Sequence, residues 1–326
     1  MAEQNKGMSD LWRRLRFVFM AIVIYRLGTH IPIPGIDPAR LAALFDQNQG
    51  TILEMFNLFS GGALERMSIF ALNVVPYISS AIIMQLFSNS IPYLQELKKD
   101  GQAGRNQITQ YTRYGTVLLA FVQASALAVT LGASGLAYEP GTSFFISAVF
   151  SVVAGTIFLM WLGEQISERG IGNGISIIIA TSILTGIPGA IGQALEQARQ
   201  GDLNILLLLG IGVLAMVVIA IVVFIERGQR RITVNYAQRQ QGRKLMQAQA
   251  SHLPFKVNMA GVIPAIFAST FLLFPQSLTQ WFGEGDPSGF LQSLTLALNP
   301  GQPLYVLVFS TLIISFCFIW LALTFN

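Results

Sequence analysis

Residues 51–86, TILEMFNLFSGGALERMSIFALNVVPYISSAIIMQL, form a long apolar stretch that is not one uninterrupted membrane span. Gly61 and Gly62 interrupt it, and Glu65 and Arg66 place charges within it. In a bilayer, a broken and charged segment is tolerated where it is buried in protein or lines a water-filled cavity. The stretch therefore predicts a segment that faces a path through the membrane and not the lipid.

The composition of the whole chain is that of a polytopic membrane protein. Of its 326 residues, 53% are apolar and 11% are charged, whereas soluble domains carry roughly 25% charged residues. A spanning helix requires about 20 mainly apolar residues. We therefore expect an all-α bundle of transmembrane helices. Eight segments meet the requirement, and they are residues 17–34, 68–90, 114–134, 143–163, 171–191, 203–225, 257–276 and 302–325.

The distribution of Lys and Arg predicts the orientation of the bundle, because short cytoplasmic loops are enriched in both residues. Basic residues gather before the first span, between the second and third spans, and between the sixth and seventh spans. Acidic residues gather in the loops on the other side. We therefore expect a cytoplasmic N-terminus, and we interpret the net charge of +4 as a topology signal.

No pattern in the sequence indicates catalysis, a cofactor or a metal site. His30 and His252 lie far apart with no cluster of partners, and Cys317 is the single cysteine. The chain has no P-loop, no HExxH and no nucleophile motif with a partner histidine. We therefore expect that the protein is not an enzyme and that a partner supplies the energy for its activity.

Residues 227–256 form the longest basic loop. The part that reads RRITVNYAQ begins with alternating β-branched residues, which is typical of a short hairpin. One interpretation is an anchor to anionic lipid. The other is a docking arm for a large anionic partner such as ribosomal RNA, because Arg–phosphate contacts dominate such binding. The length of the loop favours the docking arm, since an anchor requires only a few charges near the span ends.

Several motifs, taken in order, resemble the SecY family, the main subunit of the bacterial Sec protein-conducting channel. They are RLGTHIPIPGID, GTILEMFNLFSGGAL, QITQYTRYGT, FLMWLGEQISERGIGNGISIII, FIERGQRRITVNYAQRQQGRK, SHLPFKVNMAGVIPAIFAS and PGQPLYV. The family has ten spans, so the resemblance implies a chain that lacks the last two. It also implies an N-terminal half, residues 1–191, and a partial C-terminal half, residues 192–326.

The resemblance implies a pore closed by a ring of aliphatic side chains. The matching positions are Val74, Ile78, Ile179 and Ile266. Stiff β-branched side chains and gating by dewetting are consistent with that role. The alternative is that these residues are ordinary lipid-facing or packed side chains.

Residues 52–67 match the short half-helix, or plug, that blocks the pore of the family from outside. The matching residues are Phe56, Asn57, Phe59, Ser60, Gly61, Gly62 and Leu64. The two glycines provide a hinge, and small residues are expected to make few contacts, so that displacement of the plug is easy. The alternative is an amphipathic helix at the outer membrane surface.

The family also has a lateral gate between spans two and seven, which here involves Ser79, Gln85, Asn258 and Phe274. Weak interhelical hydrogen bonds suit such a seam, although ordinary helix packing uses similar residues. The cytoplasmic contacts of the family with ribosomes and the SecA motor ATPase correspond to Arg105, Arg231, Arg239, Arg243 and Lys244.

The implied function is translocation of unfolded secretory polypeptides across the bacterial inner membrane and lateral insertion of membrane proteins. The implied partners are SecE, SecG, SecA, the ribosome, the signal peptide, the nascent chain and membrane lipid. The alternative is a secondary transporter with broken helices. Such a transporter usually requires an intramembrane acid, and spans three to eight show none at mid-depth. Arg26, a charge deep inside the first span, is expected to be structural or to snorkel outward.

Overall fold

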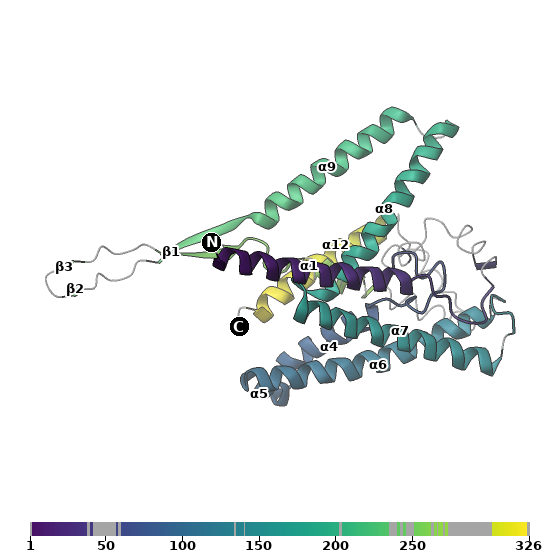
Figure 1. Cartoon of the computed structure of the whole chain (residues 1–326), viewed down its shortest axis with the longest axis horizontal. Helices are drawn as coiled ribbons and strands as arrows, with labels where there is room; N and C mark the ends of the chain where they lie inside the picture. Colours follow the sequence, from purple (N-terminus) through teal and green to yellow (C-terminus); the bar gives the residue numbers. More distant parts are fainter. Residues whose placement is uncertain are drawn as a thin grey trace. The chain divides into compact units, whose positions relative to one another are not determined.

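The computed structural model describes residues 2–37, 40–41, 57, 60–133, 135–139, 141–201, 204–234, 240–241, 244–245, 251–261, 264–265, 267–269, 271–272 and 302–324. These residues are mainly helical (Figure 1). They form two compact units. One contains the described residues within Met1–Ala190 and Ser269–Ser310, and the other those within Ile191–Ala268 and Thr311–Asn326.

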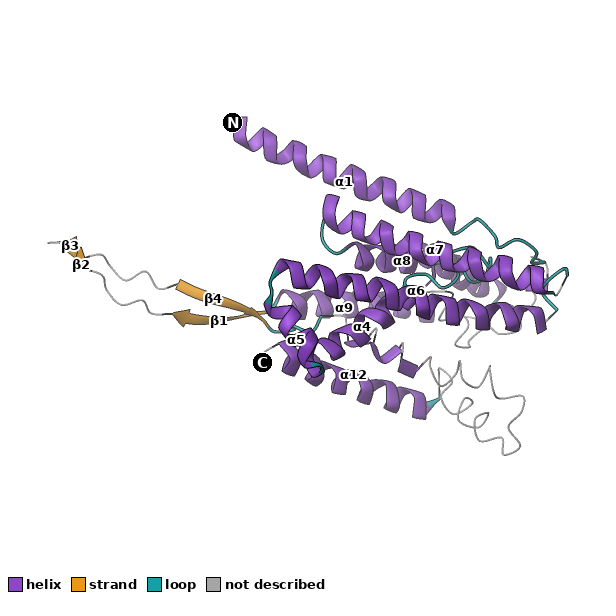
Figure 2. Ribbon diagram, turned by 90° about the horizontal axis from the view of Figure 1, so that it is seen from below, coloured by secondary structure: helices purple, strands orange, loops and turns teal. Residues whose placement is uncertain are grey.

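The first unit is a helical bundle. Its helices are α1 (Ala2–Gly28), α4 (Val75–Ser90), α5 (Pro92–Lys99), α6 (Gln102–Ala133), α7 (Thr142–Arg169) and the first part of α8 (Gly174–Gln200). Helix α6 packs against both α4 and α7, while α5 packs against α4 and α6 (Figure 2). Helix α1 packs along α7. The result is a bundle whose core lies between α1, α4, α6, α7 and the turns that precede α4.

The second unit contains α9 (Ile205–Arg227) and a β-hairpin. Asn204 caps α9, because its side-chain oxygen accepts a hydrogen bond from the Leu206 backbone N–H. Strand β1 (Gln229–Val234) begins just after α9 and pairs antiparallel with β4 (Ser251–Lys256) (Figure 2). Within the arm, β2 (Gln240–Gln241) pairs with β3 (Lys244–Leu245). The predicted hairpin arm is confirmed. Helix α12 (Pro303–Thr324) contributes to both units.

Five helices of the described part are long and apolar enough to cross a membrane, as judged by length and composition. They are Gln102–Gly132, Thr142–Arg169, Gly174–Gln200, Leu206–Arg227 and Pro303–Ala322. They correspond to five of the eight predicted spans. A sixth, α4, is apolar but shorter. The predicted span 257–276 lies partly outside the described residues.

The predicted boundaries of the first three spans are wrong. Helix α6 begins at Gln102, not at 114. Helix α4 begins at Val75, not at 68, because residues 61–74 form turns in which Met67 (φ 41°) and Asn73 (φ 49°) are left-handed. Pro76 lies in the first turn of α4, where a missing N–H leaves no intrahelical bond unmade.

The first span also differs, since α1 begins earlier than predicted and ends at Gly28. The chain that follows it is extended, not helical. The Ile33 N–H donates to the Met67 carbonyl at 2.8 Å, and the Ile69 N–H donates to the Ile31 carbonyl at 3.0 Å. This short pairing ties the exit of α1 to the turns that precede α4.

Candidate functional site

Ser60, which is helical, and the turns of residues 61–65 form a compact segment, here called the 60–65 turn, that is braced by its own hydrogen bonds. The Ser60 hydroxyl donates to the Asn57 carbonyl at 2.9 Å and accepts from the Leu64 N–H at 3.1 Å. The Asn57 side chain donates to a Glu65 carboxylate oxygen and accepts from the Glu65 N–H, both at 3.0 Å. These bonds make the turn one small rigid body.

Two side chains of α1 hold this turn. The Tyr25 hydroxyl donates to the Ser60 carbonyl at 3.1 Å, and the Arg26 guanidinium donates to the Gly61 carbonyl at 3.0 Å. Arg26 therefore has a backbone hydrogen-bond partner inside the protein. This contact supports the predicted structural role of Arg26 over the alternative in which its side chain snorkels to the membrane surface. Both contacts are made to backbone oxygens, which are present whatever the side chains of the turn are.

Gly61 allows the turn to approach α8 closely. Its φ is +68°, and a Cβ built on it would lie 3.0 Å from the Thr185 hydroxyl oxygen and 3.1 Å from the Ser182 Cα. Gly62 also has positive φ, +79°. Both glycines adopt the left-handed conformation that other residues disfavour.

Two features of the predicted plug differ from the expectation. Asn57 and Ser60 are helical, but residues 61–67 form turns, so helix does not continue to the predicted end at residue 67. The expectation of few contacts is also wrong, because α1 and α8 hold the 60–65 turn by hydrogen bonds and close packing. Asn57, Ser60, Gly61, Gly62 and Leu64 are described, whereas Phe56 and Phe59 lie outside the described residues.

The turn and three of the predicted ring residues share one hydrophobic cluster. Ala63 of the turn and Val74 are buried in it. Ile78 of α4 and Ile179 of α8 are half-buried and pack against the same cluster. The structure thus brings three of the four predicted ring positions together beside the turn. Ile266 lies outside the described residues.

A row of stacked aromatic rings begins at Tyr25, an α1 residue that contacts the turn. Tyr25 stacks on Phe70 with ring centroids 6.0 Å apart and an interplanar angle of 4°. Phe70 stacks in turn on Phe158 of α7 at 5.9 Å. Such offset pairs contribute beyond the area they bury, so the ring of Tyr25 is fixed independently of its hydroxyl group.

Sequence reasoning missed a buried polar group behind the turn. The Tyr25 hydroxyl lies 2.6 Å from the Ser182 hydroxyl, and the Asn73 amide donates to the same Ser182 oxygen at 3.1 Å. All three side chains are almost fully buried, at 1%, 0% and 3% exposure. The sequence contained a signal for this group, because each of the three is a polar residue inside or beside an apolar run. Polar residues within membrane spans are often functional.

The predicted gate residues are described separately in the two units. Ser79 is half-buried and Gln85 is exposed, both on α4. The Asn258 side chain donates to a Glu226 carboxylate oxygen at 3.2 Å and accepts from the Gly261 N–H at 3.1 Å. Phe274 lies outside the described residues. The seam itself therefore stays a prediction.

The predicted cytoplasmic contacts are described in part. Arg105 and Arg231 are exposed, on α6 and β1. Lys244 belongs to β3, whereas Arg239 and Arg243 lie outside the described residues.

Near the N-terminus, hydrogen bonds from Arg14 and Arg13 are among the effects that hold the pKa of the Asp10 carboxyl below its usual value, with the Arg14 bond the largest.

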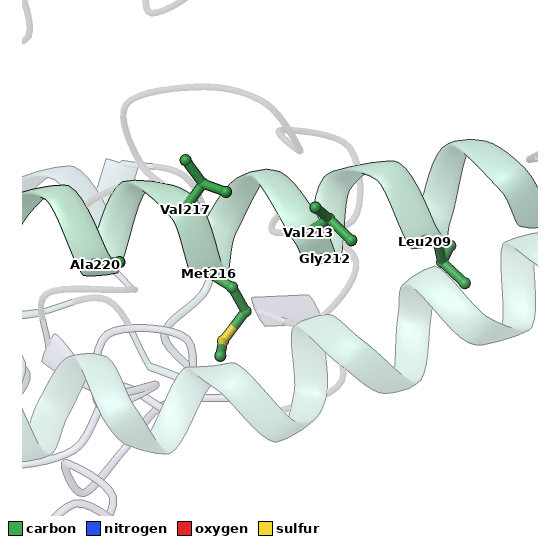
Figure 3. Close-up of a pocket in the computed structure, with 6 residues that line it drawn as sticks. All are labelled: Leu209, Gly212, Val213, Met216, Val217 and Ala220. Carbon is green, nitrogen blue, oxygen red and sulfur yellow. The ribbon is translucent and has the colours of Figure 1, made fainter.

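Helix α9 carries an open, apolar depression. Its lining residues, all from α9, are Leu209, Gly212, Val213, Met216, Val217 and Ala220 (Figure 3). None of them offers a polar group to an ion or a charged solute. Among the residues that the structure describes, no group of three or more His, Cys, Asp or Glu could hold a metal ion.

Comparison with known proteins decides the family. A model of the SecY family matches residues 68–326. The chain is 62% identical to the protein translocase subunit SecY of Pseudomonas aeruginosa over its whole length, and it covers 74% of that protein. The chain belongs to the SecY family. The SecY of Escherichia coli strain K12 is 58% identical, with 98% of this chain and 73% of that protein covered.

Solved structures of SecY-type channels have the same fold. A structure described as a protein-conducting channel matches with a TM-score of 0.60 at 21% identity, over 85% of this chain and 60% of that one. Sec61 in a canine ribosome–channel complex matches with a TM-score of 0.59 at 20% identity, over 85% and 61% of the two chains. The expected helical membrane-channel fold is thereby confirmed, and the alternative of a secondary transporter gains no support.

Proposed function

We propose that this SecY-family chain forms the polypeptide-conducting path of a protein translocase. Unfolded secretory polypeptides pass through it, and apolar helices leave it sideways into the lipid. The observation that carries the proposal is the shared cluster of Ala63, Val74, Ile78 and Ile179, in a chain that is 62% identical to a protein translocase subunit.

The chemistry of this cluster suits a seal. Apolar side chains at a constriction exclude ions by dewetting, and they offer no fixed polar group that a passing polypeptide must displace. Val74, Ile78, Ile179 and Ile266 are the proposed ring, and the plug, residues 52–67, is the proposed stopper beside it. Displacement of the stopper opens the path, and its return closes the path again.

Ser79, Gln85, Asn258 and Phe274 are the proposed lateral gate. Interhelical hydrogen bonds in membranes are worth about 0.6 kcal/mol on average. A few such bonds close a seam without preventing its opening by a signal peptide. The division of the chain into an N-terminal half, residues 1–191, and a partial C-terminal half, residues 192–326, also stays a prediction.

The proposed partners act from both the membrane and the cytoplasm. SecE and SecG are the proposed membrane partners, and SecA and the ribosome the cytoplasmic ones. Exposed Arg230 and Arg231 on β1 support an anionic partner for the arm. The chain catalyses no reaction in this proposal, so that SecA or the ribosome supplies the energy. The proposed location is the bacterial inner membrane, with the N-terminus in the cytoplasm.

Reconstitution tests the proposal. The protein, purified with its membrane partners, is placed in liposomes, and SecA, ATP and a radiolabelled secretory precursor are added. We expect the precursor to become resistant to external protease only when all components are present. Absence of protection, together with coupled uptake of a small radiolabelled solute, would instead favour a transporter.

A further inference from the structure

The buried polar group behind the 60–65 turn forms one continuous chain of hydrogen bonds. The Tyr25 hydroxyl lies 3.1 Å from the Ser60 carbonyl oxygen and 2.6 Å from the Ser182 hydroxyl, and either hydroxyl can donate in the second contact. The Ser182 oxygen accepts in turn from the Asn73 amide at 3.1 Å. The Ser182 hydroxyl also lies within donating distance of the Ile178 carbonyl oxygen, at 2.9 Å. The contacts join Asn73, Ser182, Tyr25 and Ser60 in one continuous network.

This chain links four separate parts of the sequence. Tyr25 belongs to α1, Ser182 to α8, Asn73 to the turns before α4, and Ser60 to the 60–65 turn. All four residues are at most 3% exposed. In such surroundings, each hydrogen bond is stronger than in water and an unmade bond is costly.

The conformation at Asn73 shows that the arrangement is specific. Its φ is +49°, a left-handed value that Asn tolerates better than most residues. This conformation lies directly before Val74 of the cluster and two residues before Val75, where α4 starts. The backbone at Asn73 thus adopts a disfavoured conformation while its amide reaches Ser182.

We propose that Tyr25, Ser182 and Asn73 form a latch that holds the 60–65 turn in the resting channel and that must break when the channel opens. This inference rests on the proposed function. The turn is braced internally, so it leaves as a unit, and the Tyr25–Ser60 bond is the contact that the latch makes with it. Residues of three different elements are released together, which couples movement of the turn to movement of α1, α8 and the start of α4.

Tyr25→Phe is the sharpest test, because it removes only the hydroxyl group. The ring remains stacked on Phe70. The matched control is Tyr138→Phe, at an exposed tyrosine between α6 and α7. Full-length protein with its membrane partners is reconstituted in liposomes, and chloride efflux is measured with no precursor present. SecA-driven precursor protection is measured in parallel.

We expect the Tyr25→Phe channel to leak chloride about fivefold to tenfold faster than wild type, because loss of one buried hydrogen bond shifts a two-state equilibrium by that factor. Precursor protection should be retained, since a channel that opens more easily still conducts. Ser182→Ala should also leak, and the double variant should leak less than the product of the two single effects, because both changes break one chain.

Equal efflux for Tyr25→Phe and Tyr138→Phe, with precursor protection intact, would overturn the latch while leaving the proposed function standing. Loss of protection without a rise in efflux would also overturn it, since that result indicates a structural defect alone. If Tyr25→Phe does not yield folded protein, Ser182→Ala decides the matter by the same readouts. A wild-type protein that never protects the precursor contradicts the proposed function itself.

Discussion

The Arg26 guanidinium donates a hydrogen bond to the Gly61 carbonyl oxygen at 3.0 Å. A charged donor from the first span therefore holds a glycine turn that interrupts the apolar stretch after it. Because α1 packs on α7 and the turn packs on α8, this contact fastens the turn within the first unit.

Arg26→Leu should loosen the 60–65 turn. Hydrogen bonds to charged groups are worth about 1.5–3 kcal/mol when buried, and Arg26 is half-buried. We therefore expect the free energy that holds the turn in place to fall by about 1 kcal/mol, and the fraction of molecules with a displaced turn to rise roughly fivefold. Leu64 is 8% exposed. Maleimide labelling of Leu64→Cys, in a Cys317→Ala background, measures the displaced fraction.

The matched control for this variant is Arg40→Leu. The Arg40 guanidinium also donates to a glycine carbonyl, that of Gly135, at 2.8 Å, but it does not contact the turn. The reporter Leu64→Cys is labelled in both variants, and the two labelling rates are compared. Equal rates in Arg26→Leu and Arg40→Leu would show that the Arg26 contact does not hold the turn.

Gly155→Ala should destabilise the first unit. A Cβ on Gly155 would lie 2.0 Å from the Ile69 carbonyl oxygen, which is backbone and has little freedom to move. Overpacking of this kind typically costs about 1–3 kcal/mol. Thermal unfolding in detergent measures the loss. Gly132→Ala on α6 is the control, because nothing lies within 4 Å of its Cβ position, and equal melting of the two variants would contradict the packing.

Reversing Arg243 and Lys244 to Glu should weaken ribosome binding. These two charges of the arm are proposed to contact RNA phosphates, and each lost contact reduces the slope of log affinity against log salt by about one. Co-sedimentation with ribosomes at several salt concentrations measures both quantities. Reversal of Arg199, an exposed residue near the end of α8, is the control. Unchanged affinity and slope would contradict the docking role.

Cysteines at Ser79 and Phe274 should form a disulfide in the resting channel if α4 and the seventh span border a lateral gate. Disulfides require Cα atoms within about 7 Å. In a Cys317→Ala background, we expect oxidation to join the pair and block precursor protection, and a stalled secretory polypeptide to prevent the joining. A pair that never joins would mean that these helices are not neighbours.

Much of the fold could be predicted from apolar periodicity and charge, since α7, α8, α9 and α12 lie where apolar runs of spanning length occur. The hairpin followed from β-branched alternation in residues 229–234. Helix starts were harder to predict. Polar residues 102–113 form the N-terminal part of α6, before the apolar run that predicted the span. A helix can extend past the hydrocarbon core of the membrane, so the edge of an apolar run does not mark where the helix starts.

The site could be predicted only in part. Val74, Ile78 and Ile179 look like any aliphatic residues of a membrane helix, and only the family resemblance singled them out. The latch residues Tyr25, Asn73 and Ser182 are brought together from distant positions by packing. No local pattern predicts such a meeting, and the left-handed turns at Met67 and Asn73 that allow it interrupt an apolar run that resembles a continuous helix.

The most direct test of a plug-sealed polypeptide channel is to fix the turn covalently. A Cβ on Gly61 would lie 3.0 Å from the Thr185 hydroxyl oxygen, so Gly61→Cys and Thr185→Cys can form a disulfide in a Cys317→Ala background. The reduced double variant is the reference, because cysteine at φ +68° is itself strained. The measurement is SecA-driven precursor protection in liposomes, before and after oxidation. We predict that the fully oxidised protein protects no precursor and that reduction restores protection; undiminished protection by the fully oxidised protein would contradict the account.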